Sequence, residues 1–372
     1  MIIGVLQEPA FETRVSLLPE AVAALIKKGI TIFVENGAGV KATASDDDYR
    51  KVGAEIKSAA EIVATSAIVL SIHFPDSLLQ IPRFCIFIGV YQPLFNFQQI
   101  QTWATTGITS FSLDMLPRTT RAQSMDVLSS QANIAGYKAV LYAANIFPKY
   151  FPMFMTAAGS IPPAKVLILG AGVAGLQAIA TARRLGAVVE VFDTRPAVKE
   201  EVMSLGAKFV EVAGAADASK AGGYAVEQSE TFLQKQKEKI AESIAKADIV
   251  ITTAQIPGKP APLLVTNIMI EAMKKGSVII DLAAATGGNT ELTKNNETVY
   301  HHGVAIVGNS ALPSTMPSDA SKLYGKNVLN FLQLIITKEG NLNLNWEDDL
   351  VKGSCITHDG SIVNERVKEL IK

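Results

Sequence analysis

Three glycines in the middle of the chain have the spacing that allows a backbone to bind a pyrophosphate. Gly170, Gly172 and Gly175 form a G-x-G-x-x-G pattern between an apolar run at 165–169 and a helical pattern at 175–185. In such a unit the first glycine permits a tight turn, the second admits the phosphates, and the third allows the helix to pack closely on the strand. The helix start then presents its positive dipole end. A structural turn is the alternative for the glycines alone, and the flanking strand and helix argue against it.

An acidic residue follows where a dinucleotide site needs one. Asp193 ends the apolar run 188–193, about 20 residues beyond the glycines, where a carboxylate would bond the hydroxyls of the adenosine ribose. The same charge would repel a 2′-phosphate, which favours NAD over NADP. Arg195 complicates this choice, because a nearby guanidinium can accept that phosphate. Two alternatives stay open: Asp193 as a helix N-cap ahead of Pro196, and Arg195 as a solvated loop charge.

Short apolar strands alternate with helical patterns on both sides of these motifs. The first half of the chain has strand patterns at 2–6, 31–35, 68–72 and 85–90 and helical patterns at 19–28 and 59–65. The second half has strand patterns at 165–169, 188–193, 208–211, 249–253, 277–281 and 305–307 and helical patterns at 175–185, 196–205 and 227–246. This alternation is typical of parallel sheets with right-handed crossovers.

We therefore predict an α/β fold of two Rossmann-like, doubly wound parallel-sheet domains joined by long helices. The joining helices are expected at 129–144 and 320–337. The first domain is discontinuous and comprises residues 1–128 plus 320–372, because the helix at 320–337 is expected to return and pack on it. Residues 129–319 form the dinucleotide-binding domain.

The composition excludes several classes of function. Across 372 residues, 34 Lys and Arg balance 35 Asp and Glu to a net charge of −1, which leaves no basic footprint for nucleic acid. The two cysteines, Cys85 and Cys355, cannot form a disulfide framework, which suits a reducing compartment. The histidines have no ligand spacing, so we expect no metal site. We expect no signal peptide, and no membrane span because glycine, proline or lysine interrupts the most apolar stretches, 166–182 and 139–159.

Longer motifs identify a family resemblance that spans residues 1 to about 335. The segments that carry it are PRTTRAQSMDVLSSQANIAGYKA at 117–139, GAGVAGLQAIATARRLGAVVEVFDTRP at 170–196, AGGYA at 221–225 and IPGKPAP at 256–262. They resemble the alanine dehydrogenase and transhydrogenase family. The resemblance implies NAD(H) contacts, beyond those of the glycines, Asp193 and Arg195, at Val173, Ala174, Thr194, Gly223, Tyr224, Ala254 and Gln255. Gly223 and Tyr224 would belong to a loop that closes over the nucleotide.

The same resemblance implies that one loop holds the nicotinamide end of the cofactor. Its residues here are Arg118, Gln123, Asp126 and Ser129. An amide and a hydroxyl can hydrogen-bond a carboxamide, while Arg and Asp can pair or contact ribose and phosphate. The alternative is a capped, salt-bridged loop, and it is strongest for Asp126 and Ser129 because both residue types favour helix caps.

Two substitutions argue against amino-acid oxidation. Arg14 matches the N-terminal pattern of the family, but the Lys expected near residue 73 is His73, and the segment 88–96 lacks the expected catalytic His. Without a second cation for a substrate carboxylate and a base to move a proton, Arg14 is expected to be structural and to pair with Glu8 or Glu12. Met153, Met155 and neighbouring aromatics are expected to be core or dimer contacts.

The resemblance therefore implies a subunit for re/si-specific transhydrogenation, the direct transfer of hydride between NADH and NADP⁺. Such a transfer needs orientation of the two rings and no general acid or base. NADP(H) would lie on a partner subunit, because this sequence has no second dinucleotide fingerprint. A homodimer, membrane-embedded proton-translocating subunits and a cytoplasmic location on the inner membrane are also implied. An alanine dehydrogenase-like oxidoreductase and a non-catalytic NAD-binding regulatory module stay open as alternatives.

Overall fold

The computed structural model describes residues 1–75, 85–212 and 229–370. They form two compact units: unit 1 is Met1–Gln131 with Ser314–Lys372, and unit 2 is Ala132–Pro313. The chain passes from unit 1 to unit 2 within α5 (Val127–Ile146) and returns just before α10 (Pro317–Ile335). The sequence analysis placed these boundaries at 128/129 and 319/320, a few residues away.

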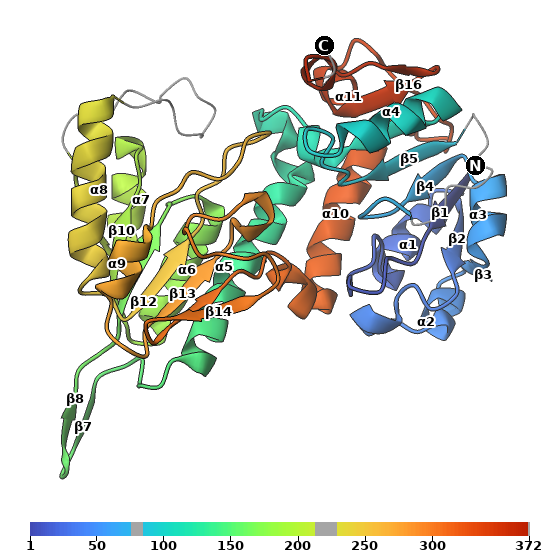
Figure 1. Cartoon of the computed structure of the whole chain (residues 1–372). Helices are drawn as coiled ribbons and strands as arrows, with labels where there is room; N and C mark the ends of the chain where they lie inside the picture. Colours follow the sequence, from blue (N-terminus) through green and yellow to red (C-terminus); the bar gives the residue numbers. More distant parts are fainter. Residues whose placement is uncertain (76–84, 213–228, 371–372) are drawn as a thin grey trace. The chain divides into compact units, whose positions relative to one another are not determined.

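Unit 1 is built on an eight-stranded sheet in the order β17-β16-β6-β5-β4-β1-β2-β3 (Figure 1). Its strands are β1 (Ile2–Val5), β2 (Thr31–Glu35), β3 (Glu55–Lys57), β4 (Ile68–Leu70), β5 (Ile86–Gly89), β6 (Thr109–Ser112), β16 (Cys355–His358) and β17 (Ser361–Ile362). The first six run parallel, and apolar β4 and β5 are buried throughout, as expected where helices cover both faces of a sheet. β16 joins β6 antiparallel and forms a hairpin with β17, an edge that the sequence pattern did not predict.

Helices surround this sheet and help to form its core. They are α1 (Pro19–Ile26), α2 (Asp46–Lys51), α3 (Ala59–Thr65), α4 (Phe97–Thr106), α10, α11 (Asp349–Ser354) and α12 (Glu365–Lys368). Ser45 and Ser58 begin α2 and α3 with reciprocal capping boxes, which satisfy backbone donors that a helix start leaves unpaired. α10 contributes Val328, Phe331 and other buried side chains to the core of unit 1, as predicted for the returning helix.

Unit 2 contains a seven-stranded sheet in the order β11-β10-β9-β12-β13-β15-β14. Its strands are β9 (Lys165–Leu169), β10 (Val188–Phe192), β11 (Lys208–Phe209), β12 (Ile249–Thr252), β13 (Val278–Asp281), β14 (Thr298–His301) and β15 (Val304–Val307). From β9 the chain winds outward to β10 and β11, then crosses to β12 on the other side. The carboxyl ends of β9 and β12 therefore meet at a topological switch point, where doubly wound sheets bind their ligands. Among these strands only β14, at the edge, is antiparallel.

The helices of unit 2 that the structure describes are α5 beyond residue 131, α6 (Val173–Arg184), α7 (Lys199–Ser204), α8 (Glu230–Ile244) and α9 (Asn267–Glu271). α5 packs so closely on the start of α6 that a Cβ at Gly136 would lie 2.0 Å from the carbonyl oxygen of Ala174. The predicted helix at 196–205 divides into a 3₁₀ turn, Pro196–Val198, and α7.

A two-stranded hairpin projects from the body of unit 2 (Figure 1). Its strands are β7 (Phe154–Thr156) and β8 (Gly159–Ile161). Met155 is 78% exposed and Met153 is 61% exposed, so the prediction that these methionines are core contacts is wrong. Their alternative assignment, to a dimer contact, stays a prediction, and exposed apolar side chains that gather on one arm are typical of such a surface.

Candidate functional site

The glycine turn of unit 2 has the backbone conformation that the motif requires. Gly170 has a φ of 107°, a value that strains any residue with a side chain. Its N–H donates to the carbonyl of Phe192 at 2.8 Å, and a Cβ would lie 2.4 Å from Oγ1 of Thr253. The turn is therefore fixed to both neighbouring strands, β10 and β12.

The other two glycines have different tasks. A Cβ at Gly175 would lie 1.9 Å from the carbonyl oxygen of Gly170, so this glycine allows α6 to pack on the turn. Gly172 is the N-cap of α6 and has neither a capping side chain nor any atom within 4 Å of where its Cβ would be. The first-turn N–H groups, including those of Val173 and Ala174, therefore point into open space with the helix dipole behind them. This arrangement fits a pyrophosphate.

Asp193 is held by the protein on all sides. Its Oδ1 accepts from the backbone N–H and Nε of Arg195, at 2.8 and 2.9 Å. Its Oδ2 accepts from the N–H of Ala171 and from Nη2 of Arg195, both at 2.7 Å. These four donors match the roughly four acceptor sites of a carboxylate. A ribose hydroxyl that bonds Asp193 would therefore replace or share one of them.

The two alternatives for this acid and its neighbour do not hold. Residue 195, and not Asp193, is the N-cap of the 3₁₀ turn that begins at Pro196. Arg195 is not a solvated loop charge, since its side chain is 17% exposed and ion-paired to Asp193, which is 6% exposed. The hydrogen bond to Asp193 raises the pKa of Arg195. Thr194, between them, is half-buried.

The loop after β12 is held by a residue that the sequence analysis did not identify. Asn289 is fully buried, and its Oδ1 accepts from the N–H of Ala254 at 3.1 Å. Its Nδ2 donates to the carbonyls of Ala254 and Pro262 at 2.9 and 2.8 Å. The N–H of Ala254 is thus already used, whereas the exposed Gln255 donates its amide to the carbonyl of Leu282 at 3.0 Å.

A signal for Asn289 exists in the sequence. It follows Gly287 and Gly288, which have φ angles of 104° and 81° just beyond the buried strand β13. A Cβ at Gly288 would lie 2.8 Å from Oδ2 of Asp281, which accepts the N–H of Asn289 at 2.6 Å. A glycine pair beyond a strand at this edge of a sheet therefore indicated a tight turn beside the cofactor loop.

The loop predicted to hold the nicotinamide end lies in unit 1. It forms a 3₁₀ turn, η3 (Thr120–Met125), followed by α5. Gln123 is exposed, and among the residues that the structure describes its side chain makes no hydrogen bond. Arg118 is also exposed. Gln123 therefore has no structural task that would explain its amide.

Asp126 and Ser129 have a structural task. Oδ1 of Asp126 accepts the N–H of Ser129 at 2.9 Å, and Oδ2 accepts its hydroxyl at 2.6 Å. Asp126 thus caps α5, as the alternative interpretation of these two residues held. The cap leaves open whether either side chain also contacts a ligand.

A buried charge cluster fills the region around Arg14. The guanidinium bonds Glu12 through Nε and Nη2, at 2.9 and 2.7 Å, and Gln131 through Nη1 at 2.8 Å. The predicted pairing of Arg14 is therefore confirmed for Glu12. Nε2 of His73 lies 2.9 Å from Oε2 of Glu12. Burial opposes ionisation of Glu12, but hydrogen bonds from Arg14 and His73 outweigh it and hold its pKa well below the ordinary range.

Glu8 lies beside this cluster in a different state. Its carboxyl is 7% exposed and accepts the N–H groups of Ile72 and His73 at 2.5 and 3.0 Å. Burial raises the pKa of Glu8 to about 7, although these two hydrogen bonds act in the opposite direction. A carboxyl that changes charge near neutrality is thus built into the end of the unit 1 sheet.

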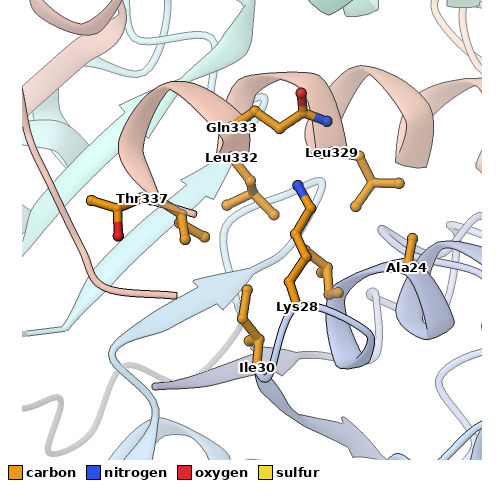
Figure 2. A pocket seen from close by; sticks show the side chains of 9 residues that line it. Ala24, Lys28, Ile30, Leu329, Leu332, Gln333 and Thr337 are labelled. Carbon is orange, nitrogen blue, oxygen red and sulfur yellow. The ribbon is translucent and has the colours of Figure 1, made fainter. Parts of the chain in front are cut away.

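A small groove in unit 1 is not a cofactor site. It lies between α1 and α10, with Leu25, Leu329 and Leu332 in its walls, and Figure 2 shows Lys28 extending toward α10. Its volume is about 70 Å³, whereas pockets for drug-sized ligands measure about 300 Å³ or more. None of the residues that line it belongs to the loop of Gln123.

Two predicted contacts, Gly223 and Tyr224, lie outside the residues that the structure describes. Within the described ranges, no group of three or more His, Cys, Asp and Glu side chains could hold a metal ion. No helix in the same ranges is long and apolar enough to cross a membrane.

Comparison with known proteins agrees with the strand–turn–helix site and the loop before α5. Residues 4–135 match the family described as "Alanine dehydrogenase/PNT, N-terminal domain", and residues 139–365 match "Alanine dehydrogenase/PNT, C-terminal domain". The chain is 46% identical to an NAD(P) transhydrogenase subunit alpha chain of Rhodospirillum rubrum, with 95% of each chain covered. It is 26% identical to an alanine dehydrogenase of Staphylococcus haemolyticus, a match that covers 88% of this chain and 84% of that one.

A solved structure agrees with these sequence matches. The crystal structure of transhydrogenase from Sinorhizobium meliloti has a TM-score of 0.88 and 44% identity over 98% of this chain and 100% of that chain. An L-alanine dehydrogenase structure, at 24% identity, shares the fold with a TM-score of 0.81. Because both halves of the sequence and the whole fold match, the chain belongs to the alanine dehydrogenase/PNT family.

Proposed function

We propose that this chain is the NAD(H)-binding subunit of a proton-translocating NAD(P) transhydrogenase. In this proposal hydride passes directly, with re/si specificity, between NADH on this chain and NADP⁺ on a partner subunit. The observation that carries the proposal is the exposed Gln123, an amide without a structural partner among the described residues, in a loop that is otherwise fixed. The identity of 46% to a transhydrogenase subunit, against 26% to an alanine dehydrogenase, supports this branch of the family.

The dinucleotide would be bound mainly by the turn of unit 2. The first-turn N–H groups of α6, at Val173 and Ala174, would donate to the pyrophosphate in the open space beside Gly172. The Asp193 carboxylate would bond the adenosine ribose in exchange for part of its contact with Arg195. The loop of Ala254 and Gln255, held by Asn289, would line the same edge of the sheet.

The remaining contacts would orient the reacting end. The nicotinamide ring, when bound, supplies the carbon that gives or receives hydride. The Gln123 amide would hold the ring's carboxamide, with Arg118, Asp126 and Ser129 beside it, because an amide offers both a donor and an acceptor to such a group. No residue needs to move a proton, so the site needs orientation more than acid–base chemistry. The hydrogen bond of His73 to Glu12 is consistent with a structural task for that histidine.

The partners follow from the same proposal. NADP(H)-binding and membrane-embedded subunits would complete the enzyme, with this chain on the cytoplasmic face of the inner membrane. A homodimer would cover the exposed apolar side chains of the β7–β8 arm and its base, Tyr150, Met153, Phe154, Met155 and Ile161. Because exposed apolar side chains that gather in one place are typical of protein contacts, the arm is the segment that we assign to the dimer.

The deciding experiment replaces Gln123 by Asn, which keeps the amide and shortens its reach. The loss of one orienting hydrogen bond removes only about 1 kcal/mol of net binding, so NADH affinity should stay within roughly tenfold. Misplacement of the ring by about 1 Å can cost on the order of a hundredfold in rate. We therefore expect transfer to fall far more than binding when the purified chain is mixed with a transhydrogenase NADP(H)-binding subunit.

The controls separate the proposal from its alternatives. Wild-type transfer in Gln123→Asn would contradict the orienting task of Gln123. Absence of transfer in the wild-type complex, with tight NADH binding, would favour a regulatory module. The chain alone should produce no NADH from NAD⁺ and L-alanine, and production that scales with enzyme would instead favour the alanine dehydrogenase alternative.

A further inference from the structure

The backbone around Gln123 is fixed although its side chain is exposed. Ala122 and Met125, on either side, are buried at 4% and 7% exposure. The carbonyl of Gln123 accepts the N–H of Asp126 at 3.4 Å. The side chain of Gln123 therefore projects from a short turn that Ala122 and Met125 anchor in unit 1.

Two asparagines of α10 converge on the next peptide group. Nδ2 of Asn327 and Nδ2 of Asn330 both donate to the carbonyl oxygen of Ser124, each at 2.8 Å. Residues three apart lie on the same face of a helix, and a carbonyl oxygen has two lone pairs. The two amides thus saturate the single carbonyl that follows Gln123.

Helix stability alone does not explain these asparagines. Asparagine is a weaker helix former than alanine or leucine, because its side chain competes for backbone hydrogen bonds. Asn327 is 8% exposed, and its Oδ1 has no hydrogen-bond partner among the described residues. An apolar side chain would fill such a buried position at lower cost. The bonds to Ser124 are what these two amides contribute.

The loop is held at two further points. Arg121 forms ion pairs with Asp348 at 2.5 Å and with Asp349 at 3.0 Å, next to the start of α11. At the other end, Asp126 caps α5. These contacts bracket the turn, and the bonds to Ser124 lie between them, one residue from Gln123.

We infer that Asn327 and Asn330 are positioning residues for Gln123. The inference rests on the proposed function, because it assigns α10 the task of holding the amide of Gln123 where it meets the nicotinamide carboxamide. A pre-organised turn avoids ordering the loop when the nucleotide binds, and small displacements of a positioned group lower the rate more than the affinity. Neither asparagine contacts the nucleotide itself in this proposal.

The test uses Asn330→Ala, because Asn330 is only half-buried and its loss leaves the core of unit 1 intact. Asn330→Gln, which keeps an amide donor, is the conservative partner. Lys326→Ala, at an exposed position on the same helix, is the control. In the complex reconstituted with an NADP(H)-binding subunit, we expect Asn330→Ala to lower the transfer rate about tenfold. NADH affinity should stay within about twofold, and the thermal midpoint should remain near that of the control. Asn330→Gln should recover part of the rate.

A double-mutant cycle shows whether the effect passes through Gln123. If it does, Asn330→Ala combined with Gln123→Asn should lower the rate little more than Gln123→Asn alone, since coupled residues are not additive. Fully additive effects, or an unchanged rate in Asn330→Ala, would overturn the inference. Asn327→Ala, compared at equal folded fraction, should show the same pattern, and its failure to do so would also count against the inference. Should Gln123→Asn itself leave the rate unchanged, the proposed function fails first.

Discussion

Replacement of Asp193 by Asn should shift the preference of this chain from NADH toward NADPH. The carboxylate accepts four hydrogen bonds, three of them from Arg195. Asparagine keeps one acceptor oxygen and loses the charge, so residue 193 no longer neutralises the Arg195 guanidinium at the edge where the ribose would lie. The substitution therefore turns a neutral pair into a positive site.

The size of the shift follows from these charges. In the wild type the two charges are joined at 2.7 Å, so their effects on a 2′-phosphate largely cancel. After the substitution, the guanidinium about 5 Å from a phosphate charge attracts it by about 3 kcal/mol at an effective dielectric of 20, and by less than about 1 kcal/mol in water. We expect the ratio of NADH to NADPH dissociation constants to change by about 1 to 3 kcal/mol, or roughly 5- to 150-fold. NADH itself should lose less.

Isothermal titration calorimetry of both nucleotides measures this ratio. Arg195→Ala is the matched control, because it removes the opposite charge of the same pair and should strengthen the preference for NADH. Both shifts should shrink as the ionic strength rises, since the charges are partly exposed. Calorimetry in which the two variants move the ratio in the same direction, or not at all, would refute the assignment of the 2′-position to this pair.

Two further predictions follow from the glycine turn and from the buried acids. Gly172→Ala should fold normally and bind NADH weakly, because its Cβ would fill only the open space, whereas Gly175→Ala should destabilise unit 2, because its Cβ would lie 1.9 Å from the carbonyl of Gly170; thermal unfolding with and without NADH separates the two, and equal losses of stability would contradict the reasoning. The pKa of Glu8 is raised from 4.5 to about 7, so burial penalises its charged form and the free energy of unfolding should fall as pH rises through that window, by up to about 3 kcal/mol. The pKa of Glu12 is lowered, so its contribution should be lost as pH falls below about 4.5; denaturant unfolding at several pH values measures both limbs, and a Glu8→Gln variant that keeps the upper limb would exclude Glu8 as its cause.

Much of the fold could be predicted because it is encoded locally. The glycine motif lies within one strand–turn–helix unit, so Gly170 and Gly175 could be assigned from neighbouring residues alone. The strands at 31–35 and 165–169 and the helix at 59–65 have the predicted bounds, since each is an uninterrupted apolar or amphipathic run between turn residues. The return of α10 to unit 1 was predictable from its apolar face.

What the tertiary structure alone decided depends on contacts between distant residues. The antiparallel edges formed by β14 and by β16 with β17 depend on which strand lies at the rim, and strand orientation leaves no periodicity in a short apolar run. The bonds of Asn327 and Asn330 to Ser124 join residues that are 203 and 206 positions apart. Asn289 likewise bonds Ala254 across two strands.

The pairing of Arg195 with Asp193 shows the same division within three residues. Their types and spacing predicted a ribose site and an alternative phosphate partner. Only the folded turn decided that the two side chains bond each other, because the N–H of Ala171, on the preceding loop, holds the carboxylate in place. Sequence determined which chemistry was available at this edge of the sheet, and tertiary packing determined which of those groups already have partners, because hydrogen-bond geometry is set by the folded backbone.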